Sequence, residues 1–280
     1  MGFRLVPADG SRDPRIEDPS NLYLIHPTGR LLLPLALRAG ISANTVSMIG
    51  LLLGAGAALC FAHWSDWRLA TLGFLLCVAW LIADGLDGMI ARATKTSSAL
   101  GRALDGLCDH GVFFLLYFSL AWSIGTLEAW VLAVAAGSVH AVQANLYEAE
   151  RLRFHRRIKG DAGGPPLPSL GNPLVRLYDN LMRVFDRWAG QFDQELERSP
   201  GAQRLGAIYG ERAVPPLKMM SLLSGNMRVL GIYLACLAGD PRLFLWFELI
   251  PQSLVALSGI FWHRGVEATF VRKSVSRFEA

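Results

Sequence analysis

The chain has 280 residues, of which 52% are hydrophobic and 18% are charged, and its mean hydropathy is +0.33. A soluble domain usually carries about 25% charged residues, so this composition excludes an ordinary soluble globular protein and indicates a membrane protein. The net charge of +4 and the pI near 9.0 come from basic residues at the ends of apolar segments. Such residues face anionic lipid headgroups, and we therefore expect no nucleic-acid binding.

The first 40 residues predict a polar N-terminus followed by a helix at the membrane surface. Residues 1–20 are polar and lack the apolar core of a signal peptide. Residues 21–40, NLYLIHPTGRLLLPLALRAG, mix apolar and basic side chains. This mixture is typical of an amphipathic helix that lies along the headgroups.

Six later segments are long and apolar enough to cross a bilayer as helices, which takes about 20 residues each. They are residues 43–63, 67–91, 103–124, 126–149, 217–238 and 242–263. Basic residues gather at the ends away from the three short loops, so the positive-inside rule places both termini in the cytoplasm. We predict an all-α integral membrane protein with six transmembrane helices and a single membrane domain over 1–280, its first four spans lying within 43–152 and its last two within 217–263.

Residues 153–215 are predicted to form a cytoplasmic or interfacial segment. The Gly/Pro-rich stretch 160–173 is typical of an irregular connection. After it, apolar residues recur every three or four positions, which predicts an amphipathic helix at the headgroups or against a partner. These residues are Leu174, Leu177, Leu181, Phe185, Trp188 and Phe192.

The four cysteines are expected to be small packing residues. They lie in apolar segments without paired spacing, at Cys60, Cys77, Cys108 and Cys236. Cys108 directly precedes Asp109, but a soft thiolate does not suit a set of carboxylate ligands. We therefore predict neither a disulfide nor a cysteine metal cluster.

Four aspartates within residues 84–109 lie between two uncharged apolar runs, 71–83 and 111–122. Asp84 and Asp87 share one face of a helix, and Asp105 and Asp109 form a stripe on the next helix. A turn over 93–101 makes these helices antiparallel neighbours, so the four carboxylates converge. Their repulsion requires protonation or bound cations. Oxygen ligands select Mg²⁺ or Mn²⁺, and this many carboxylates indicate two ions.

Glycines and an arginine accompany the aspartates. Gly85, Gly88 and Gly101 open the backbone to a bulky ligand, and Arg92 offers a fixed cation to phosphate oxygens. Together these groups predict a pyrophosphate site. Helix packing by glycine and a satisfied polar network would explain one such residue alone, but not the whole set.

The motif resembles the signature of a known family. Asp84, Asp87, Gly88, Ala91, Arg92, Gly101, Asp105 and Asp109 match D-x-x-D-G-x-x-A-R-x8-G-x3-D-x3-D without departure. This pattern is similar to that of the CDP-alcohol phosphotransferases, integral membrane enzymes of phospholipid synthesis, and residues 40–54 look like that family's entry into its first helix. The resemblance implies a six-helix fold, two divalent ions, and cleavage of a CDP-linked donor with release of CMP.

The resemblance also implies roles for single residues. Asp84, Asp87 and Asp105 would be metal ligands, and Asp109 would be both a ligand and the general base. Contacts to the cytidine nucleotide are implied for Gly88, Arg92 and Gly101. We expect Gly85, Ser98 and Arg102 to contribute to the same pocket.

The acceptor site is less well defined by the sequence. Arg151 and Glu148 lie at the end of the fourth span, and Arg228 lies within the fifth. Arg228 either recognises a phosphate on the acceptor or pairs with a helix carboxylate such as Glu148. Arg151, Arg156, Arg157 and Arg228 favour an anionic acceptor. We therefore expect phosphatidyl transfer from CDP-diacylglycerol to a phosphorylated polyol such as inositol phosphate or glycerol phosphate.

Several alternatives stay open. A choline- or ethanolamine-type enzyme would instead transfer a CDP-linked headgroup to a lipid alcohol. A non-enzymatic cation-binding or transport protein would favour midplane sites and repeated halves, a prenyltransferase would show more spans, and a silent lipid-binding relative would have lost an aspartate. The expected partners are the donor, the alcohol and membrane lipids, with a homodimer left open. The active site is expected at the cytoplasmic face of a bacterial inner membrane or an organellar membrane.

Overall fold

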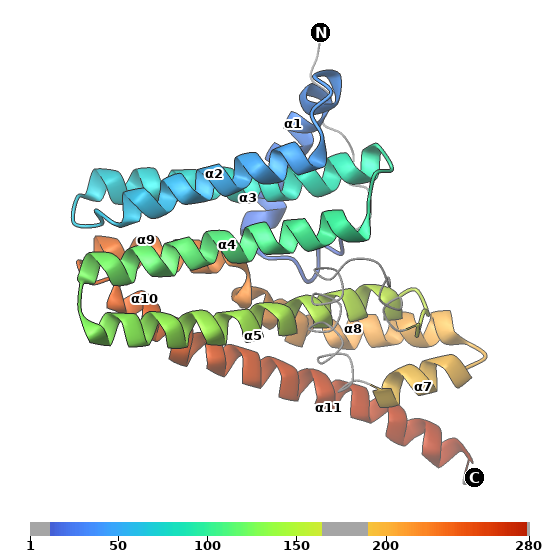
Figure 1. Ribbon diagram of the computed structural model, residues 1–280. Helices are drawn as coiled ribbons and strands as arrows, with labels where there is room; N and C mark the ends of the chain where they lie inside the picture. Colours follow the sequence, from blue (N-terminus) through green and yellow to red (C-terminus); the bar gives the residue numbers. More distant parts are fainter. Residues whose placement is uncertain (1–11, 164–189, 279–280) are drawn as a thin grey trace. The chain divides into compact units, whose positions relative to one another are not determined.

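The computed structural model describes residues 12–163 and 190–278, and all regular structure in these ranges is helical (Figure 1). The order is η1 (Asn21–Ile25), α1 (His26–Arg38), α2 (Ala43–Phe61), α3 (Trp67–Ala93), α4 (Ala99–Ile124), α5 (Leu127–Arg157), α7 (Gly190–Arg198), α8 (Ala202–Met220), η3 (Ser221–Leu223), α9 (Gly225–Leu237), α10 (Arg242–Phe247), η4 (Glu248–Gln252) and α11 (Ser253–Phe278). The predicted all-α class is therefore confirmed for the described residues.

Five stretches are long and apolar enough to cross a membrane, and a sixth is reached if α8 to α9 counts as one broken span. The predicted span over 217–238 is observed as a broken helix rather than a continuous one. Its helix is interrupted at Ser224, whose backbone is extended with φ −66° and ψ 155°. Hydropathy continues across this point, so only the backbone reveals the interruption.

The described chain divides into two compact units. One contains residues 18–141 and 225–251, and the other contains residues 12–17, 142–163, 190–224 and 252–278. The boundary falls within α5, whose first half belongs to the first unit and whose second half belongs to the second.

In the first unit, α2 packs against both α3 and α4 (Figure 1). Side chains cap each of these helices at its N-terminus, because Ser42, Asp66 and Ser98 accept hydrogen bonds from backbone N–H groups of the first turn. Helix α4 ends at Gly125, which has a positive φ of 71°. These local signals set where the helices that carry the aspartates begin and end.

Small residues let α2 approach its neighbours closely. A Cβ atom at Gly50 would lie 3.2 Å from Cδ1 of Trp80 on α3, and one at Gly54 would overlap the branched side chain of Val112 on α4. Close approach through small residues is a common way for helices to pack in membranes.

We expect Gly54→Ala to destabilise the protein, because Val112 is stiff and cannot yield without a backbone shift. Overpacking of this kind costs about 1–3 kcal/mol. Gly56→Ala is the matched control on the same helix, since its Cβ would meet only Cδ1 of Leu76, at 3.5 Å. The measurement is the apparent melting temperature in detergent. Equal melting temperatures for both variants would show that α2 does not depend on close packing at Gly54.

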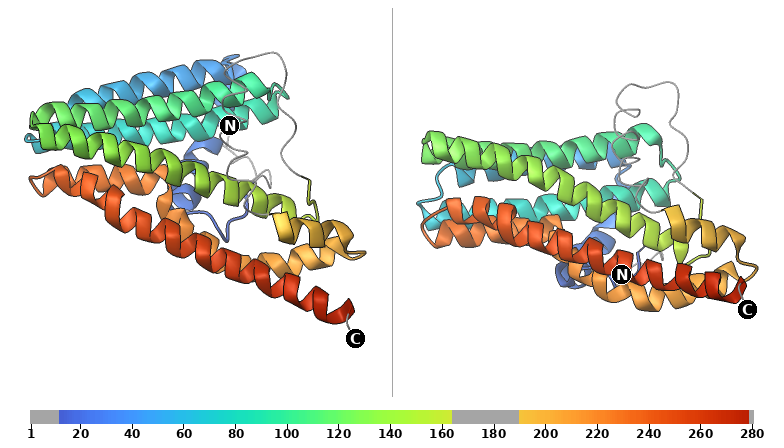
Figure 2. Two further views of the ribbon diagram at one scale, coloured as in Figure 1. Left: turned by 60° about the horizontal axis from the view of Figure 1, so that its bottom comes forward. Right: turned by 90° about the horizontal axis from the view of Figure 1, so that it is seen from below.

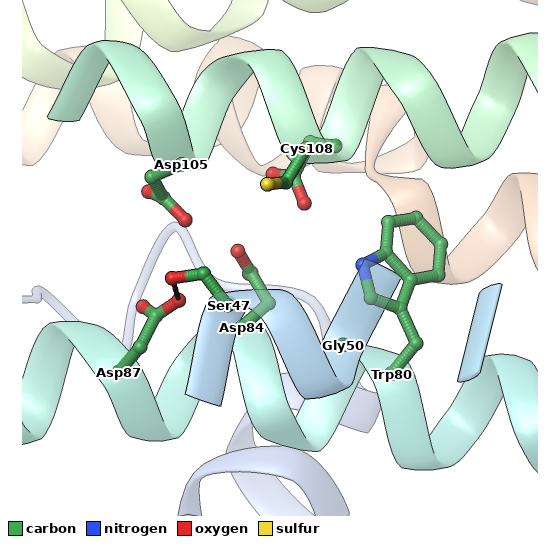
Figure 3. A pocket seen from close by; sticks show the side chains of 8 residues that line it. Ser47, Gly50, Trp80, Asp84, Asp87, Asp105 and Cys108 are labelled. Carbon is green, nitrogen blue, oxygen red and sulfur yellow. Dashed lines mark hydrogen bonds between the residues drawn. The ribbon is translucent and has the colours of Figure 1, made fainter. Parts of the chain in front are cut away.

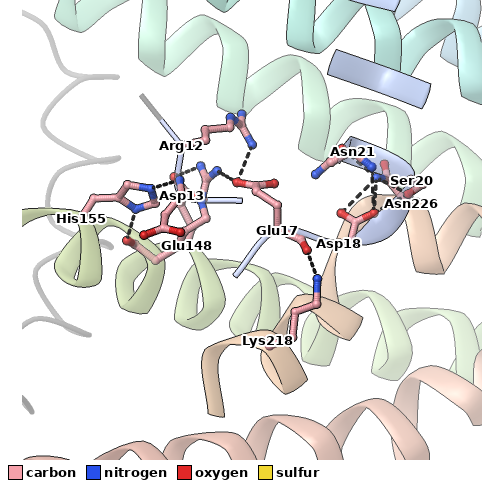
Figure 4. A network of polar contacts seen from close by, with 11 residues as sticks. Arg12, Asp13, Glu17, Asp18, Ser20, Asn21, Glu148, His155, Lys218 and Asn226 are labelled. Atoms are coloured by element: carbon pink, nitrogen blue, oxygen red, sulfur yellow. Dashed lines mark hydrogen bonds and ion pairs between the residues drawn. The ribbon is translucent and has the colours of Figure 1, made fainter. Parts of the chain in front are cut away.

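The N-terminal part of the first unit contains the predicted surface helix. The helix is observed as η1 followed by α1, and Leu31 and Leu35 on α1 are exposed. The side-chain amide of Asn226, in the first turn of α9, donates to the carboxylate of Asp18 at 3.1 and 3.2 Å (Figure 4). This contact connects the segment before η1 to α9.

In the second unit, α8 and α11 lie side by side (Figure 2). Phe192 of α7 is buried and stacks on Tyr209 of α8, with ring centroids 4.8 Å apart. Phe192 is the only member of the predicted amphipathic pattern within the described residues. The other five members, between Leu174 and Trp188, lie outside them.

Candidate active site

Four aspartates line one pocket between α3 and α4 (Figure 3). Asp84 and Asp87 come from the C-terminal half of α3, and Asp105 and Asp109 come from the first half of α4. The carboxylates of Asp84 and Asp105 point toward one another across the pocket. Asp87 is only 5% exposed, and the other three aspartates are half-buried.

Three of the four carboxylates form a compact group. Asp84, Asp105 and Asp109 each offer an oxygen within 4.8 Å of the others. Asp87 is not a member of this set of three, and its Oδ2 accepts a hydrogen bond from Oγ of Ser47 at 2.5 Å. None of the described residues that line the pocket is basic. A set of hard oxygen donors with concentrated negative charge fits divalent cations such as Mg²⁺ or Mn²⁺.

Side chains outside the motif complete the pocket wall. Ser47 and Gly50 come from α2, Trp80 precedes Asp84 by one turn of α3, and Cys108 precedes Asp109 on α4. The sequence prediction did not include Ser47, Gly50 or Trp80. Ser47, Gly50 and Gly54 are spaced by three and four residues and so share one face of a helix. This spacing could have indicated that α2 packs closely against the helices that carry the aspartates.

The predicted nucleotide contacts lie on the same two helices. Arg92 is exposed in the last turn of α3, and a Cβ atom at Gly88 would lie 3.2 Å from its Nη1. Any side chain at position 88 would thus crowd the guanidinium. Gly85 lies on α3 between the two aspartates, where a Cβ atom would approach the first-unit residues Ile25 and His26 at 3.5 and 3.8 Å.

Ser98 has a structural role that the prediction did not include. Its Oγ accepts a hydrogen bond from the backbone N–H of Gly101 at 2.9 Å and caps α4. Arg102 is exposed in the first turn of the same helix. Both residues precede Asp105 by about one to two turns.

Two of the predicted acceptor residues bind each other. In the second unit, Arg151 donates to both carboxylate oxygens of Glu148 at 2.9 and 2.8 Å. Arg151 also approaches Glu17 at 3.4 Å, and Lys218 donates to the backbone oxygen of Glu17 (Figure 4). The segment before α1 is thereby attached to α5.

The partner suggested for Arg228 is corrected by the structure. In the first unit, Nε of Arg228 on α9 donates to Glu248 at 3.0 and 3.2 Å, and their side chains are 1% and 0% exposed. The observed carboxylate is therefore Glu248 rather than Glu148. Glu248 begins η4 directly after α10, and the short connection between α9 and α10 packs those two helices against each other.

A second cluster of ligand-type residues, Glu150, His263 and Glu267, is buried in the second unit. The carboxylate oxygens of this cluster already accept hydrogen bonds from arginines. Arg264 donates to Glu150 and to Glu267 at 2.5 Å each. Arg153 bonds to Glu150 at 2.7 Å, and Arg157 bonds to Glu267 and, at 2.6 Å, to Asp193. Three arginines therefore face three carboxylates, and Nδ1 of His263 lies 2.7 Å from Glu150. We interpret this cluster as an ion-pair network rather than a metal site.

Comparison with known proteins gives a match to one family model and to several similar proteins. A family model described as CDP-alcohol phosphatidyltransferase matches residues 41–170. Cholinephosphotransferase 1 from Xenopus laevis is 34% identical over 100 residues, which are 32% of this chain and 25% of that protein. CDP-diacylglycerol–serine O-phosphatidyltransferase from Helicobacter pylori strain J99 is 36% identical over 78 residues, which are 25% of this chain and 33% of that protein.

The matched regions cover only a quarter to a third of the relatives' own lengths. No solved structure gives a significant match to the chain. The family match at 41–170 includes all four aspartates, but the comparisons do not extend to the whole length of the relatives.

Proposed function

Because residues 41–170 match a family model described as CDP-alcohol phosphatidyltransferase, we propose that this protein transfers a substituted phosphate group from a CDP-linked donor to an alcohol and releases CMP. The observation that carries the proposal is the convergence of Asp84, Asp87, Asp105 and Asp109 on one pocket. Four carboxylates without a basic neighbour among the described lining residues suit a metal-assisted phosphoryl transfer.

In the proposed mechanism Asp84, Asp87 and Asp105 would hold divalent cations, and Asp109 would be both a ligand and the general base. The bound cations would neutralise the donor pyrophosphate and stabilise the charge that develops on CMP. Asp109 accepts the proton of the acceptor hydroxyl as the hydroxyl oxygen bonds to the phosphorus distal to cytidine. The bond from that phosphorus to the bridging oxygen breaks, and CMP leaves with the electron pair.

The chain's own groups would bind the nucleotide at the cytoplasmic ends of α3 and α4. Arg92 offers its guanidinium to phosphate oxygens, and Gly85, Gly88 and Gly101 leave room for the nucleotide against the backbone. Ser98 and Arg102 would extend the same surface. The cytoplasmic location is part of the proposal and rests on the distribution of basic residues along the spans.

For the substrates, we propose CDP-diacylglycerol as the donor and a phosphorylated polyol as the acceptor. The name of the bacterial relative supports a CDP-diacylglycerol donor. In this proposal Arg151 and Glu148 contribute to the acceptor site. Arg157, in contrast, is fully buried and bound to Asp193 and Glu267, which leaves fewer arginines for an anionic acceptor than the sequence suggested.

A second candidate function is the transfer of a CDP-linked headgroup to a lipid alcohol. The frog relative is a cholinephosphotransferase by name, and its alignment favours this candidate. A cationic headgroup would be recognised by carboxylates and aromatic faces.

The two candidates are separated by a product screen. Protein purified in detergent is given Mg²⁺ or Mn²⁺ with either CDP-diacylglycerol and a panel of headgroup alcohols, or CDP-choline and CDP-ethanolamine with diacylglycerol. CMP release and lipid mass spectrometry identify the reaction. Turnover of the second set alone would replace the substrate proposal, and no turnover of any CDP-linked donor would refute the enzymatic function.

The buried pair of Arg228 and Glu248 gives a separate prediction. We expect Arg228→Met to lower the apparent melting temperature, because it removes the cation from a buried ion pair, which costs about 3–5 kcal/mol. Adding Glu248→Met should recover much of the loss, since hydrophobic pairs often replace buried ion pairs without cost. The acceptor KM of the double variant should stay near the wild-type value. A stable double variant with a raised acceptor KM would instead place Arg228 in the acceptor site.

A further inference from the structure

One contact to the aspartate pocket comes from a helix that does not carry the motif. Ser47 lies on α2, is half-buried, and lines the pocket beside the aspartates (Figure 3). Its Oγ donates to Oδ2 of Asp87 at 2.5 Å. A hydrogen bond to a carboxylate is stronger than one between neutral groups and holds its acceptor in one orientation.

The position of Ser47 follows from the packing of α2. Gly50 and Gly54 allow α2 to approach Trp80 and Val112 closely, and Ser47 lies one turn before Gly50 on the same face. The Ser47 hydroxyl also lies 3.2 Å from the backbone oxygen of Ala43. It has one proton for two acceptors, and the contact to Asp87 is the shorter by 0.7 Å.

The bond singles out one of the four carboxylates. Asp84, Asp105 and Asp109 form the compact group of oxygens, and Asp87 is not a member of it. Because Oδ2 of Asp87 accepts from Ser47, rotation of this carboxylate is restricted. A partner that orients a metal-binding carboxylate typically changes metal affinity by about 10–100-fold when it is removed.

We propose that Ser47 is a positioning residue that orients Asp87 and thereby sets the affinity of one of the two cation sites. This inference rests on the proposed function, which supplies the divalent cations. Ser47 acts through Asp87 and touches neither the donor nor the acceptor in this role. The cation site formed by the other three aspartates does not depend on it.

The test is a titration of the purified protein with Mn²⁺, followed by electron paramagnetic resonance in the absence of substrates. The wild type should bind two ions per chain. Ser47→Ala should lower the Mn²⁺ affinity of one site by about 10–100-fold. The Mn²⁺ affinity of the other site should stay within about twofold of the wild-type value. Ser47→Thr keeps the hydroxyl and should restore the weakened site.

Ser138→Ala is the matched control. Ser138 is an exposed helical serine whose Oγ donates to the backbone oxygen of Val134 at 2.8 Å, so the variant loses the same kind of intrahelical bond without affecting a pocket carboxylate. If Ser47→Ala does not yield folded protein, Ser47→Cys keeps the volume with a weak donor and should weaken the same site. A thiol is a poor ligand for Mn²⁺.

Steady-state kinetics give a second measurement. In Ser47→Ala, the Mn²⁺ concentration for half-maximal CMP release should rise in the same proportion as the weakened site, and the rate at saturating metal should fall much less. Unchanged Mn²⁺ binding in Ser47→Ala, or equal weakening of both sites, would overturn the inference alone. A wild type that binds no Mn²⁺ would instead refute the metal centre of the proposed function, and the inference with it.

Discussion

Asp109→Asn is expected to lower kcat by about 10²–10⁴-fold, which is the range for loss of a general base. Asparagine has nearly the shape of aspartate and keeps one oxygen for a metal, but it cannot take the proton from the acceptor hydroxyl. Asp109 is half-buried on α4, and its carboxylate lies within the compact group formed with Asp84 and Asp105. Because asparagine is nearly the same size, the variant should keep the packing of the pocket. Much of the donor affinity should remain, measured as the KM for the CDP-linked donor alongside kcat.

Asp66→Asn is the matched control for this variant. Asp66 caps α3 at the end remote in sequence from the motif, where it accepts from the backbone N–H of Arg68 at 2.9 Å. Asparagine caps helices about as well as aspartate, so this variant should keep the wild-type kcat. Activity near the wild-type level in Asp109→Asn would exclude Asp109 as the base.

Asp84→Ala and Asp105→Ala are each expected to abolish turnover. Each change removes one carboxylate from the compact group of three, and the remaining pair is a poorer site for a hard cation. Mn²⁺ binding, followed by electron paramagnetic resonance, should weaken together with the loss of CMP release. Removal of metal from the wild type with a chelator should stop CMP release, and added Mg²⁺ or Mn²⁺ should restore it.

Asp240→Ala provides a comparison outside the pocket. Asp240 accepts from the backbone N–H of Arg242 before α10, and its loss should leave Mn²⁺ binding unchanged. If Asp84→Ala or Asp105→Ala released CMP at the wild-type rate, the proposed role of these carboxylates as metal ligands would be wrong.

The sequence was sufficient to bring the four aspartates together because the inference used only local geometry. Helical periodicity puts Asp84 and Asp87 on one face of α3 and Asp105 and Asp109 on one face of α4. The five residues between α3 and α4 are too few to separate the helices. The pairing of these two helices therefore follows from the chain itself.

Contacts between helices that are distant in sequence could not be predicted in the same way. Glu148 and Glu248 are both helix carboxylates, and hydropathy does not indicate which of them faces Arg228. Ser47 was missed for the same reason, because its partner Asp87 is 40 residues away on another helix. Arg157 looked like part of an exposed basic cluster, but packing in the second unit buries it completely.

The interruption at Ser224 shows another limit. The apolar residues on either side continue the pattern of a single span, and hydropathy measures composition rather than backbone geometry. A serine followed by glycine is compatible with a helix and with a break. Only the extended backbone of Ser224 distinguishes the two.

The ion-pair network of the second unit has a consequence for how the protein is made. Glu150 and Arg157 of α5 are synthesised about a hundred residues before His263, Arg264 and Glu267 of α11, which supply several of their partners. During translation the second half of α5 is therefore made before its buried charges can be fully compensated, and an uncompensated buried charge is costly. This half of α5 reaches its final environment only when α11 arrives. Maturation of the second unit is thus tied to the synthesis of α11.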